Sequence, residues 1–251
     1  MARIPFDSLW RPSGVAVDSK RNIYVTDNGH SRVLEMTPEG RQRTLAITWA
    51  RSPSAVAVDV AGNVYVADSA RGSEKIVRLG TDGVQSIIRI AELRNPTDLR
   101  FDAAGNLYVV DSWAERIVRI APNGTEETIP PGDLDHPFAV HVDQAGTITV
   151  SNRAESVGII RLDANGSRTT LPFTGLDQPT GLDIDAAGNV YVAQSGQSGT
   201  YGARILKLTP SGEQSVVPFA RDALYRPMGI VVRDGFITVA DQLGFVEQLA
   251  L

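Results

Sequence analysis

Four charged or titratable side chains lie at related positions in three neighbouring segments of the sequence. Asp98 and Arg100 belong to the first segment, His141 to the second and Asp183 to the third. A histidine oriented by Asp183 or Asp98 can act as a general base, and Arg100 can hold a developing negative charge. This set would suit a lyase or a hydrolase with His141 as the base. The alternative is an ion-pair network that serves only the fold.

A second set of candidate residues is aromatic, basic or both, and lies in predicted loops. Such side chains on loops are common in the recognition of ligands and peptides. We expect a ligand-binding site formed by Trp10, Trp49, Arg51, Arg94, Trp113, His136, Arg153, Tyr201, Tyr225 and Arg226. In the alternative interpretation, Trp10, Trp49 and Tyr225 fill gaps between structural units. The loop 195–203 is rich in Gly and Ser, and we expect a mobile flap there.

A repeated unit must position both sets. Its clearest copy is 179–194, which predicts two short strands joined by a tight turn with the pattern Asp-x-x-Gly-Asn. Six copies open with a proline, at Pro12, Pro53, Pro96, Pro137, Pro179 and Pro227. A period near 40 residues made of short strands is typical of a β-propeller, in which each repeat is one four-stranded blade. We therefore predict an all-β, six-bladed β-propeller with antiparallel blades, formed by residues 1–251 as a single domain.

The ring is expected to close through the two ends of the chain. In the first copy the predicted strands are 15–18, 22–26 and 32–36, and a tight turn and an outer strand follow. The last copy has only three strands before the chain ends, while residues 2–8 resemble the outer strand of other copies. We predict that this N-terminal strand completes the C-terminal blade. Closure of this kind leaves no exposed inner edge.

Polar residues that repeat in register are interpreted as scaffold. Aspartates that end the inner strands are expected to cap turns: Asp18, Asp59, Asp102, Asp143 and Asp185. Aspartates that end the second strands are expected to form structural pairs, as Asp27 with Arg32 and Asp111 with Arg116. In the fourth copy Ser151 is interpreted as the replacement for this aspartate and Gly158 as that for its partner. The repeated tyrosines are expected in the core: Tyr24, Tyr65, Tyr108 and Tyr191.

Three repeated phrases resemble NHL repeats over essentially the whole chain: Pro-x-Gly-hydrophobic-x-Val-Asp, Gly-Asn-hydrophobic-Tyr-Val-x-Asp and Arg-hydrophobic. The phrase Leu171-Pro-Phe-Thr-Gly-Leu176 is similar to the extracellular sensor propeller of mycobacterial serine/threonine kinases. The resemblance implies a six-bladed propeller used mainly to bind ligands, proteins or RNA. Related propellers include streptogramin lyases, peptide-amidating lyases, lactonase-type hydrolases and strictosidine synthase-like enzymes. The resemblance therefore implies the fold and leaves the function open.

Composition narrows the partners. The net charge of −5, from 24 Lys and Arg against 29 Asp and Glu, disfavours nucleic acid or an anionic membrane as the main partner. The chain has no cysteine, which excludes disulfides and thiol chemistry, and no apolar run long enough to span a bilayer. We expect a cytoplasmic monomer, or an extracellular protein if the chain is an excised domain. The three histidines lie in separate segments, so neither a metal site nor another cofactor is predicted.

Three functions follow as hypotheses. The first is a binding module that presents an aromatic and arginine-rich pocket, at the central channel, to a small anionic or aromatic molecule or to a peptide. The second is a small-molecule lyase or hydrolase that uses the cluster of His141, Asp183 and Arg100. The third is a structural or designed propeller without a ligand.

Overall fold

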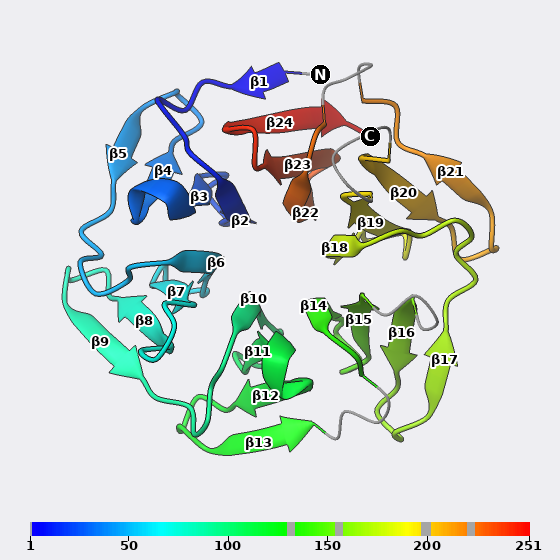
Figure 1. Ribbon diagram of the computed structural model, residues 1–251, viewed down its shortest axis with the longest axis horizontal. Coiled ribbons are helices and arrows are strands. Elements are labelled where there is room, and N and C mark those ends of the chain that lie inside the picture. The colour runs from blue at the N-terminus through cyan, green and yellow to red at the C-terminus, as the bar shows by residue number, and fades with distance from the viewer. Residues whose placement is uncertain (1, 130–133, 154–157, 197–201, 220–223) are drawn as a thin grey trace.

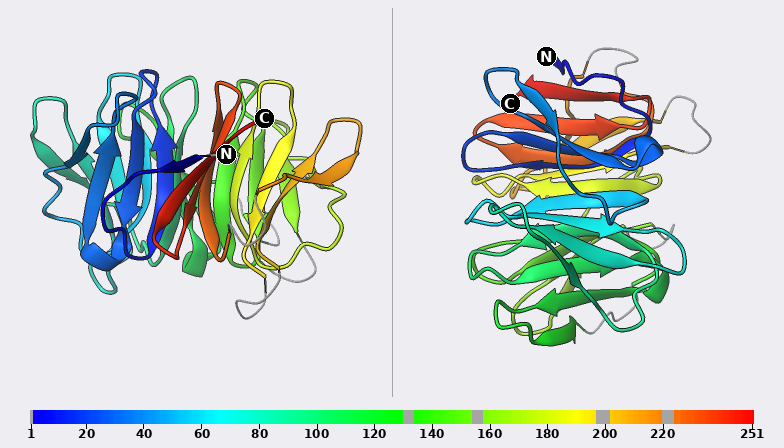
Figure 2. Two further views of the ribbon diagram at one scale, coloured as in Figure 1. Left: turned by 90° about the horizontal axis from the view of Figure 1, so that it is seen from above. Right: turned by 90° about the vertical axis from the view of Figure 1, so that its left-hand side faces the viewer.

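Six four-stranded antiparallel sheets form a ring around a central channel in the computed structural model of the protein (Figure 1). The structure describes residues 2–129, 134–153, 158–196, 202–219 and 224–251. The side views show strands running between the two faces of the ring (Figure 2). Helical structure in the described residues is confined to two single-turn 3₁₀ helices, η1 (Asn28–His30) and η2 (Ser112–Ala114). Within the described part of the chain, no helix has the length and apolar character needed to cross a bilayer.

The strands of each blade follow one another from the channel to the rim. Blades 1 and 2 consist of β2 (Pro12–Val17), β3 (Ile23–Asp27), β4 (Arg32–Met36), β5 (Gln42–Thr44), β6 (Pro53–Val58), β7 (Val64–Asp68), β8 (Lys75–Leu79) and β9 (Gln85–Ile88). Blades 3 and 4 consist of β10 (Pro96–Phe101), β11 (Leu107–Asp111), β12 (Arg116–Ile120), β13 (Glu126–Ile129), β14 (Pro137–Val142), β15 (Ile148–Asn152), β16 (Ile159–Leu162) and β17 (Arg168–Thr170). Blades 5 and 6 consist of β18 (Pro179–Ile184), β19 (Val190–Gln194), β20 (Arg204–Leu208), β21 (Gln214–Val216), β22 (Pro227–Arg233), β23 (Phe236–Asp241), β24 (Phe245–Ala250) and β1 (Ala2–Ile4). Each inner strand therefore begins at the proline itself, earlier than the sequence pattern indicated.

The two ends of the chain close the ring as predicted. Strand β1 pairs antiparallel with β24, with Ala2 opposite Gln248 and Ile4 opposite Val246 (Figure 1). The Nε of Arg3 donates to Glu247 Oε1 at 2.9 Å across this pair. The closing strand has three residues rather than the predicted seven, because the chain leaves the sheet after Ile4.

Apolar side chains pack between neighbouring blades and hold them together. Tyr24 of blade 1 packs with Val56 and Val66 of blade 2, and Tyr191 of blade 5 packs with Ile230 of blade 6. Burial raises the pKa of Tyr191 to about 12. Each fully buried side chain of this size stabilises the fold by about 1.5–3 kcal/mol. The predicted core position of the tyrosines is confirmed, although Tyr65 is only partly buried.

One face of the ring, which we call the turn face, carries the Asp-x-x-Gly-Asn turns. The Asp185 carboxylate accepts backbone N–H groups from Ala187 and Asn189, the side-chain amide of Asn189 and the hydroxyl of Tyr191. The same four kinds of donor surround Asp18, Asp59 and Asp102. In blade 4 the Asn and Tyr positions are threonines, and Asp143 keeps the two backbone donors. The predicted turn caps are therefore confirmed.

Candidate functional site

The opposite face, which we call the loop face, is built from loops that the second strands hold in place. The Asp111 carboxylate at the end of β11 accepts the backbone N–H groups of Arg94 and Asn95, and it pairs with Arg116 at 3.3 Å. Asp27, Asp68 and Asp241 accept loop N–H groups in the same way. Asp27 pairs with Arg32 at 2.7 Å. The expected structural role of these aspartates is confirmed, and that role fixes the entry of the chain into each inner strand.

Blade 4 departs from the aspartate pattern, though not where the sequence comparison placed the change. Asn152, rather than Ser151, occupies the aspartate position, because it lies opposite Pro137 and its Oδ1 accepts the backbone N–H of Asp135 at 2.8 Å. The sequence pattern placed the replacement one residue too early, at Ser151. Ser151 is also a buried polar side chain of β15, but it does not lie opposite the proline. Ser151 instead donates to the Thr180 carbonyl of blade 5 at 2.7 Å.

The residue before each inner-strand proline lies on the loop face and varies among the blades, with arginine in two of them. In chain order these residues are Arg11, Ser52, Asn95, His136, Gln178 and Arg226. Arg11, His136 and Gln178 have φ of 54°, 51° and 51°, a left-handed conformation that is unfavourable for residues other than glycine. Backbone strain of this kind often marks functional sites. The positions before the prolines are thus a variable part of an otherwise repetitive ring.

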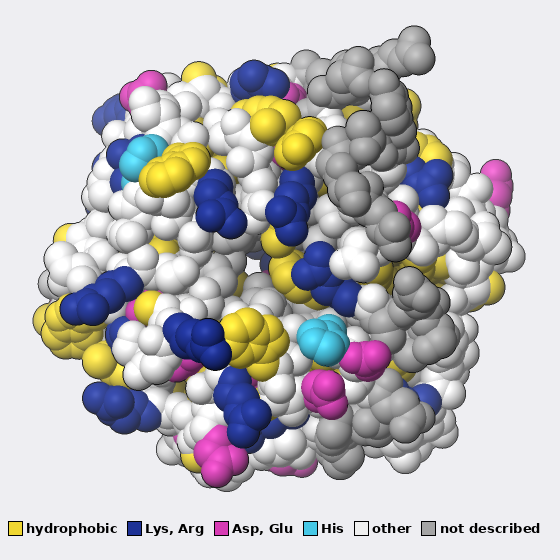
Figure 3. All heavy atoms as spheres, in the orientation of Figure 1, with side chains coloured by type: hydrophobic (Ala, Val, Ile, Leu, Met, Phe, Trp, Pro, Cys, Tyr) yellow, Lys and Arg dark blue, Asp and Glu magenta, His cyan; other side chains and the backbone are white. Residues whose placement is uncertain are grey.

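Two adjoining hollows open on the loop face. The first, the channel cavity, has a volume of about 250 Å³ and is lined by Ser13, Gly14, Val15, Asn28, Ser52, Ser54, Ser69, Asn95, Thr97, Asp98, Arg100, Phe138, Ala139, Gly181, Met228, Gly229, Ile230 and Gln242. The second, the outer pocket, has a volume of about 410 Å³ and is lined by Asn95, Ser112, Trp113, Asp135, His136, Phe138, Arg153 and Gln178. Figure 3 shows this face, with Lys and Arg side chains gathered around the central opening.

The inner strands approach one another most closely where a glycine follows the proline by two positions. A Cβ atom on Gly181 would lie 2.6 Å from the Met228 carbonyl oxygen, and one on Gly229 would lie 2.6 Å from that of Ser13. Blades 5, 6 and 1 therefore touch backbone to backbone at this level. Asp98 occupies the same position in blade 3, so its side chain needs a wider gap between strands.

The channel cluster predicted from the sequence forms a connected network. The Arg100 guanidinium donates to the backbone carbonyls of Val140, Leu182 and Ile230, in the three following blades, at 3.3, 3.4 and 2.9 Å. Its Nε lies 3.7 Å from Asp98 Oδ2. The same Asp98 oxygen also accepts the Val140 N–H at 2.9 Å. Burial raises the pKa of Asp98 against the opposing effect of Arg100.

His141 and Asp183 form the second half of this network. His141 Nδ1 and Asp183 Oδ1 are 2.7 Å apart, and Asp183 Oδ2 accepts the Val232 N–H at 2.7 Å. Burial alone would raise the pKa of Asp183, but Arg100 and the His141 hydrogen bond outweigh it and hold the pKa below its ordinary value. Neither residue lines the channel cavity, whereas Asp98 and Arg100 do.

Of the predicted binding residues, Trp113, His136 and Arg153 line the outer pocket together. Phe138, Asn95 and Gln178 line the same pocket, and the sequence analysis did not select them. Asn95 and Gln178 precede prolines, so a comparison of the pre-proline positions would have found them. Phe138 stands where blades 1, 2, 3 and 5 have a serine or threonine, which is also a departure from the repeat.

The other predicted binding residues are spread around the loop face. Trp10 is 57% exposed and contacts the His30 ring edge-on, and Trp49 and Tyr225 are also exposed. Arg51, Arg94 and Arg226 are exposed, and the backbone of each is held by an aspartate. These six residues line neither hollow. Tyr201 and most of the predicted flap lie outside the described residues.

Arg153 is the electrostatic centre of the outer pocket. Its guanidinium carbon lies 4.7 Å from the centroid of the Phe138 ring. Burial lowers its pKa, and the positive charge of Arg226 lowers it further. Its Nε is buried and has no hydrogen-bond partner among the described residues. A partly desolvated cation near a second cation favours the arrival of an anion.

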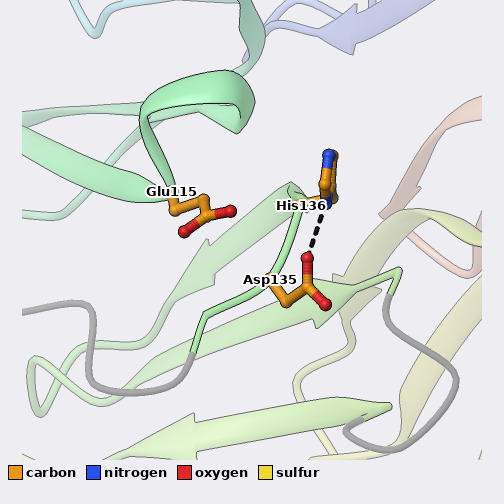
Figure 4. Close-up of side chains that lie close together, drawn as sticks. All are labelled: Glu115, Asp135 and His136. Atoms are coloured by element: carbon orange, nitrogen blue, oxygen red, sulfur yellow. Dashed lines mark hydrogen bonds and ion pairs between the residues drawn. The ribbon is translucent and has the colours of Figure 1, made fainter.

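Glu115, Asp135 and His136 gather at the edge of the outer pocket (Figure 4). Their donor atoms all lie within 4.8 Å of one another, and His136 Nδ1 is 2.6 Å from Asp135 Oδ1. Carboxylates and imidazole are common ligands of divalent metals. All three side chains are exposed, and such groups also gather without a metal, so we assign no ion to them.

Comparison with known proteins supports the fold. The family model of the NHL repeat matches residues 9–35. The protein is similar in structure to a gluconolactonase from Xanthomonas campestris, with a TM-score of 0.79 and 17% identity over 100% of this chain and 92% of that one. It is also similar to a streptogramin B lyase (TM-score 0.74, 14% identity, 100% and 86% coverage) and to virginiamycin B lyase from Staphylococcus aureus (0.69, 14%, 100% and 87%). At such identities the likeness establishes a six-bladed propeller and nothing about the site. No curated protein matches the sequence.

Proposed function

We propose that the protein binds a small anionic molecule with an aromatic part in the outer pocket of the loop face. The observation that carries this proposal is Arg153, whose buried Nε lacks a partner while its guanidinium carbon lies over the Phe138 ring. An incoming carboxylate would pair with the guanidinium and offset the repulsion from Arg226, and a turn of the side chain would bring the covered Nε to it. Trp113, 52% exposed beside this cation, offers a π surface for the aromatic part.

The turn face offers a larger groove, of about 730 Å³, between blades 3 and 4. Its walls include Asp102 and Asp143, which are turn caps common to the repeats. A groove built from repeated scaffold groups whose hydrogen bonds are largely made has less to offer a ligand. The loop face is therefore the better candidate.

A catalytic role for the channel cluster is the alternative, favoured by the short contact between His141 and Asp183 and by the lyase and gluconolactonase folds among similar structures. Against it, Arg100 already donates to three backbone carbonyls and has a limited capacity to stabilise a substrate anion. We propose that this cluster joins blades 3 to 6. His141→Ala should then lower stability by about 1–3 kcal/mol and leave ligand binding at the outer pocket unchanged.

The binding proposal can be tested by isothermal titration calorimetry with salicylate and its neutral analogue salicyl alcohol. We expect salicylate to bind more tightly than salicyl alcohol, by about tenfold, because only the carboxylate can pair with Arg153. Arg153→Gln should abolish that preference. Arg51→Gln, which removes an exposed arginine outside the pocket, is the matched control and should preserve it. Equal affinities for the two probes, or a preference that survives Arg153→Gln, would overturn the proposal.

A further inference from the structure

The channel cavity and the outer pocket share two lining residues, Asn95 and Phe138. Building on the proposed function, we infer that the channel cavity is a second subsite, which binds an uncharged group of the same ligand through hydroxyl or amide hydrogen bonds. The ligand would then be a conjugate. Its anionic aromatic part would occupy the outer pocket, and its neutral polar part would enter the channel.

The polar side chains that line the channel cavity are mostly uncharged. They are hydroxyls and amides from blades 1, 2, 3 and 6: Ser13, Asn28, Ser52, Ser54, Ser69, Asn95, Thr97 and Gln242. The two charged side chains of the lining, Asp98 and Arg100, already contact each other and the backbone. A charged group entering here would lose hydration without gaining a free counter-charge. Hydroxyl and amide groups suit this lining better.

Thr97 supplies the observation that points to a ligand. The residue after the proline donates its hydroxyl to a carbonyl of the next blade in three other copies. Ser13 donates to Ser54 O at 2.8 Å, Ser54 to Pro96 O at 2.6 Å and Thr180 to Pro227 O at 2.7 Å. Thr97 Oγ1 is buried, yet it has no partner among the described residues. Thr97 lines the cavity, so a turn of its side chain would bring this covered hydroxyl to a partner in the cavity.

The size of the cavity limits the group that it accepts. A volume of about 250 Å³ equals roughly eight water molecules at about 30 Å³ each. This is enough for one sugar-sized ring with its hydroxyls. Arg100, held by carbonyls of blades 4 to 6, limits the depth to which such a group can enter.

The inference is tested by calorimetry of the intact protein with three probes: salicylate, salicylic acid 2-O-β-D-glucoside and methyl β-D-glucopyranoside. We expect the salicylic acid glucoside to bind more tightly than salicylate, by about tenfold. Thr97→Val should reduce this advantage about fivefold, through the loss of one hydrogen bond, and should leave salicylate affinity unchanged. Thr180→Val is the matched control, because it makes the same substitution at the same strand position outside the cavity. It should leave the advantage intact.

The outcomes separate this inference from the proposed function. If salicylate binds but its glucoside binds no more tightly, or if Thr97→Val leaves the advantage intact, the channel subsite is wrong and the outer pocket stands. If salicylate fails to bind while methyl glucoside binds in a Thr97-dependent manner, the outer pocket is wrong and the channel subsite stands. If none of the three probes binds, both proposals are overturned.

Discussion

The two faces of the ring use polar residues in opposite ways. On the turn face, Asp18, Asp59, Asp102 and Asp185 accept the same four kinds of donor, each from within its own blade. On the loop face, the residue before the proline is not constant, and only Arg11 and Arg226 are of the same type. A group whose hydrogen bonds are made within its blade stabilises the fold and has little left to offer a ligand. Repetition among the copies thus marks scaffold, and divergence marks the candidate site.

Unpartnered buried atoms sharpen this difference. Five buried side-chain atoms lack a partner among the described residues. Thr97 Oγ1, Asn152 Nδ2 and Arg153 Nε belong to blades 3 and 4 on the loop-face side, whereas Arg204 Nε and Glu247 Oε2 lie in blades 5 and 6. Blade 4 is also the copy in which the aspartate and its basic partner are both replaced, by Asn152 and Gly158. The site therefore coincides with the weakest match to the repeat.

The channel cluster departs from the repeat, but its hydrogen bonds are made within the protein, and this assigns it to the scaffold. The substitution Arg100→Met is the strongest test of that assignment. The substitution removes the bonds to three carbonyls and leaves Asp98 and Asp183 without their buried counter-charge. We expect the free energy of unfolding to fall by about 3–5 kcal/mol in urea denaturation. Arg89→Met, at an exposed arginine, is the control and should change it by less than about 0.5 kcal/mol. A stable Arg100→Met protein would remove the cluster from the scaffold.

The acid limb of the stability curve tests the same assignment. At neutral pH, Asp183→Asn should lower the free energy of unfolding by about 2 kcal/mol, because it removes a charged acceptor from His141 and Val232. The pKa of Asp183 is lower in the folded state than in the unfolded chain. Its contribution is therefore present above the ordinary pKa of about 3.9 and is lost as the pH falls through the folded value. Asp98 is present in both wild type and the Asp183→Asn variant, so the difference between their stability curves reports on Asp183.

The difference in unfolding free energy between wild type and Asp183→Asn is measured from pH 7 to pH 2.5. The difference should shrink below about pH 4. A difference that stays constant over the range would mean that the Asp183 charge does not stabilise the fold.

The sequence predicted the scaffold more completely than the site, for a physical reason. Strand order, six blades and ring closure follow from a pattern that occurs six times in the sequence. An error in one copy, such as the assignment of Ser151 to the aspartate position, therefore does not change the predicted fold. The combination of residues that forms the candidate site occurs only once in the sequence. Residue type alone selected Trp10, Trp49 and Tyr225 as readily as Trp113, because all four lie on exposed loops. Which loops converge depends on the spacing of the inner strands, set by contacts such as that of Gly181 with Met228.

A matched pair of substitutions tests the contrast at one strand position. The single hydroxyl hydrogen of Thr180 has carbonyls of its own and of the next blade within reach, at 3.1 and 2.7 Å, whereas Thr97 Oγ1 has no partner among the described residues. We expect Thr180→Val to lower the free energy of unfolding by about 1 kcal/mol and Thr97→Val to leave it unchanged or raise it slightly. Thermal and urea denaturation of both variants would show this. Equal losses would mean that Thr97 also has a structural partner, for instance an ordered water.

The smallest expected effect on folding belongs to Trp113→Ala. Trp113 lies on the loop face with half of its surface exposed, and Arg71 is 5.8 Å from its ring centroid. We expect its replacement to change stability by less than about 0.5 kcal/mol and to weaken salicylate binding about tenfold, through loss of the aromatic contact. Trp10→Ala, an equally exposed tryptophan outside both hollows, should leave binding unchanged. If the two substitutions weaken binding alike, the pocket extends around the ring, and divergence among the copies would no longer locate the site.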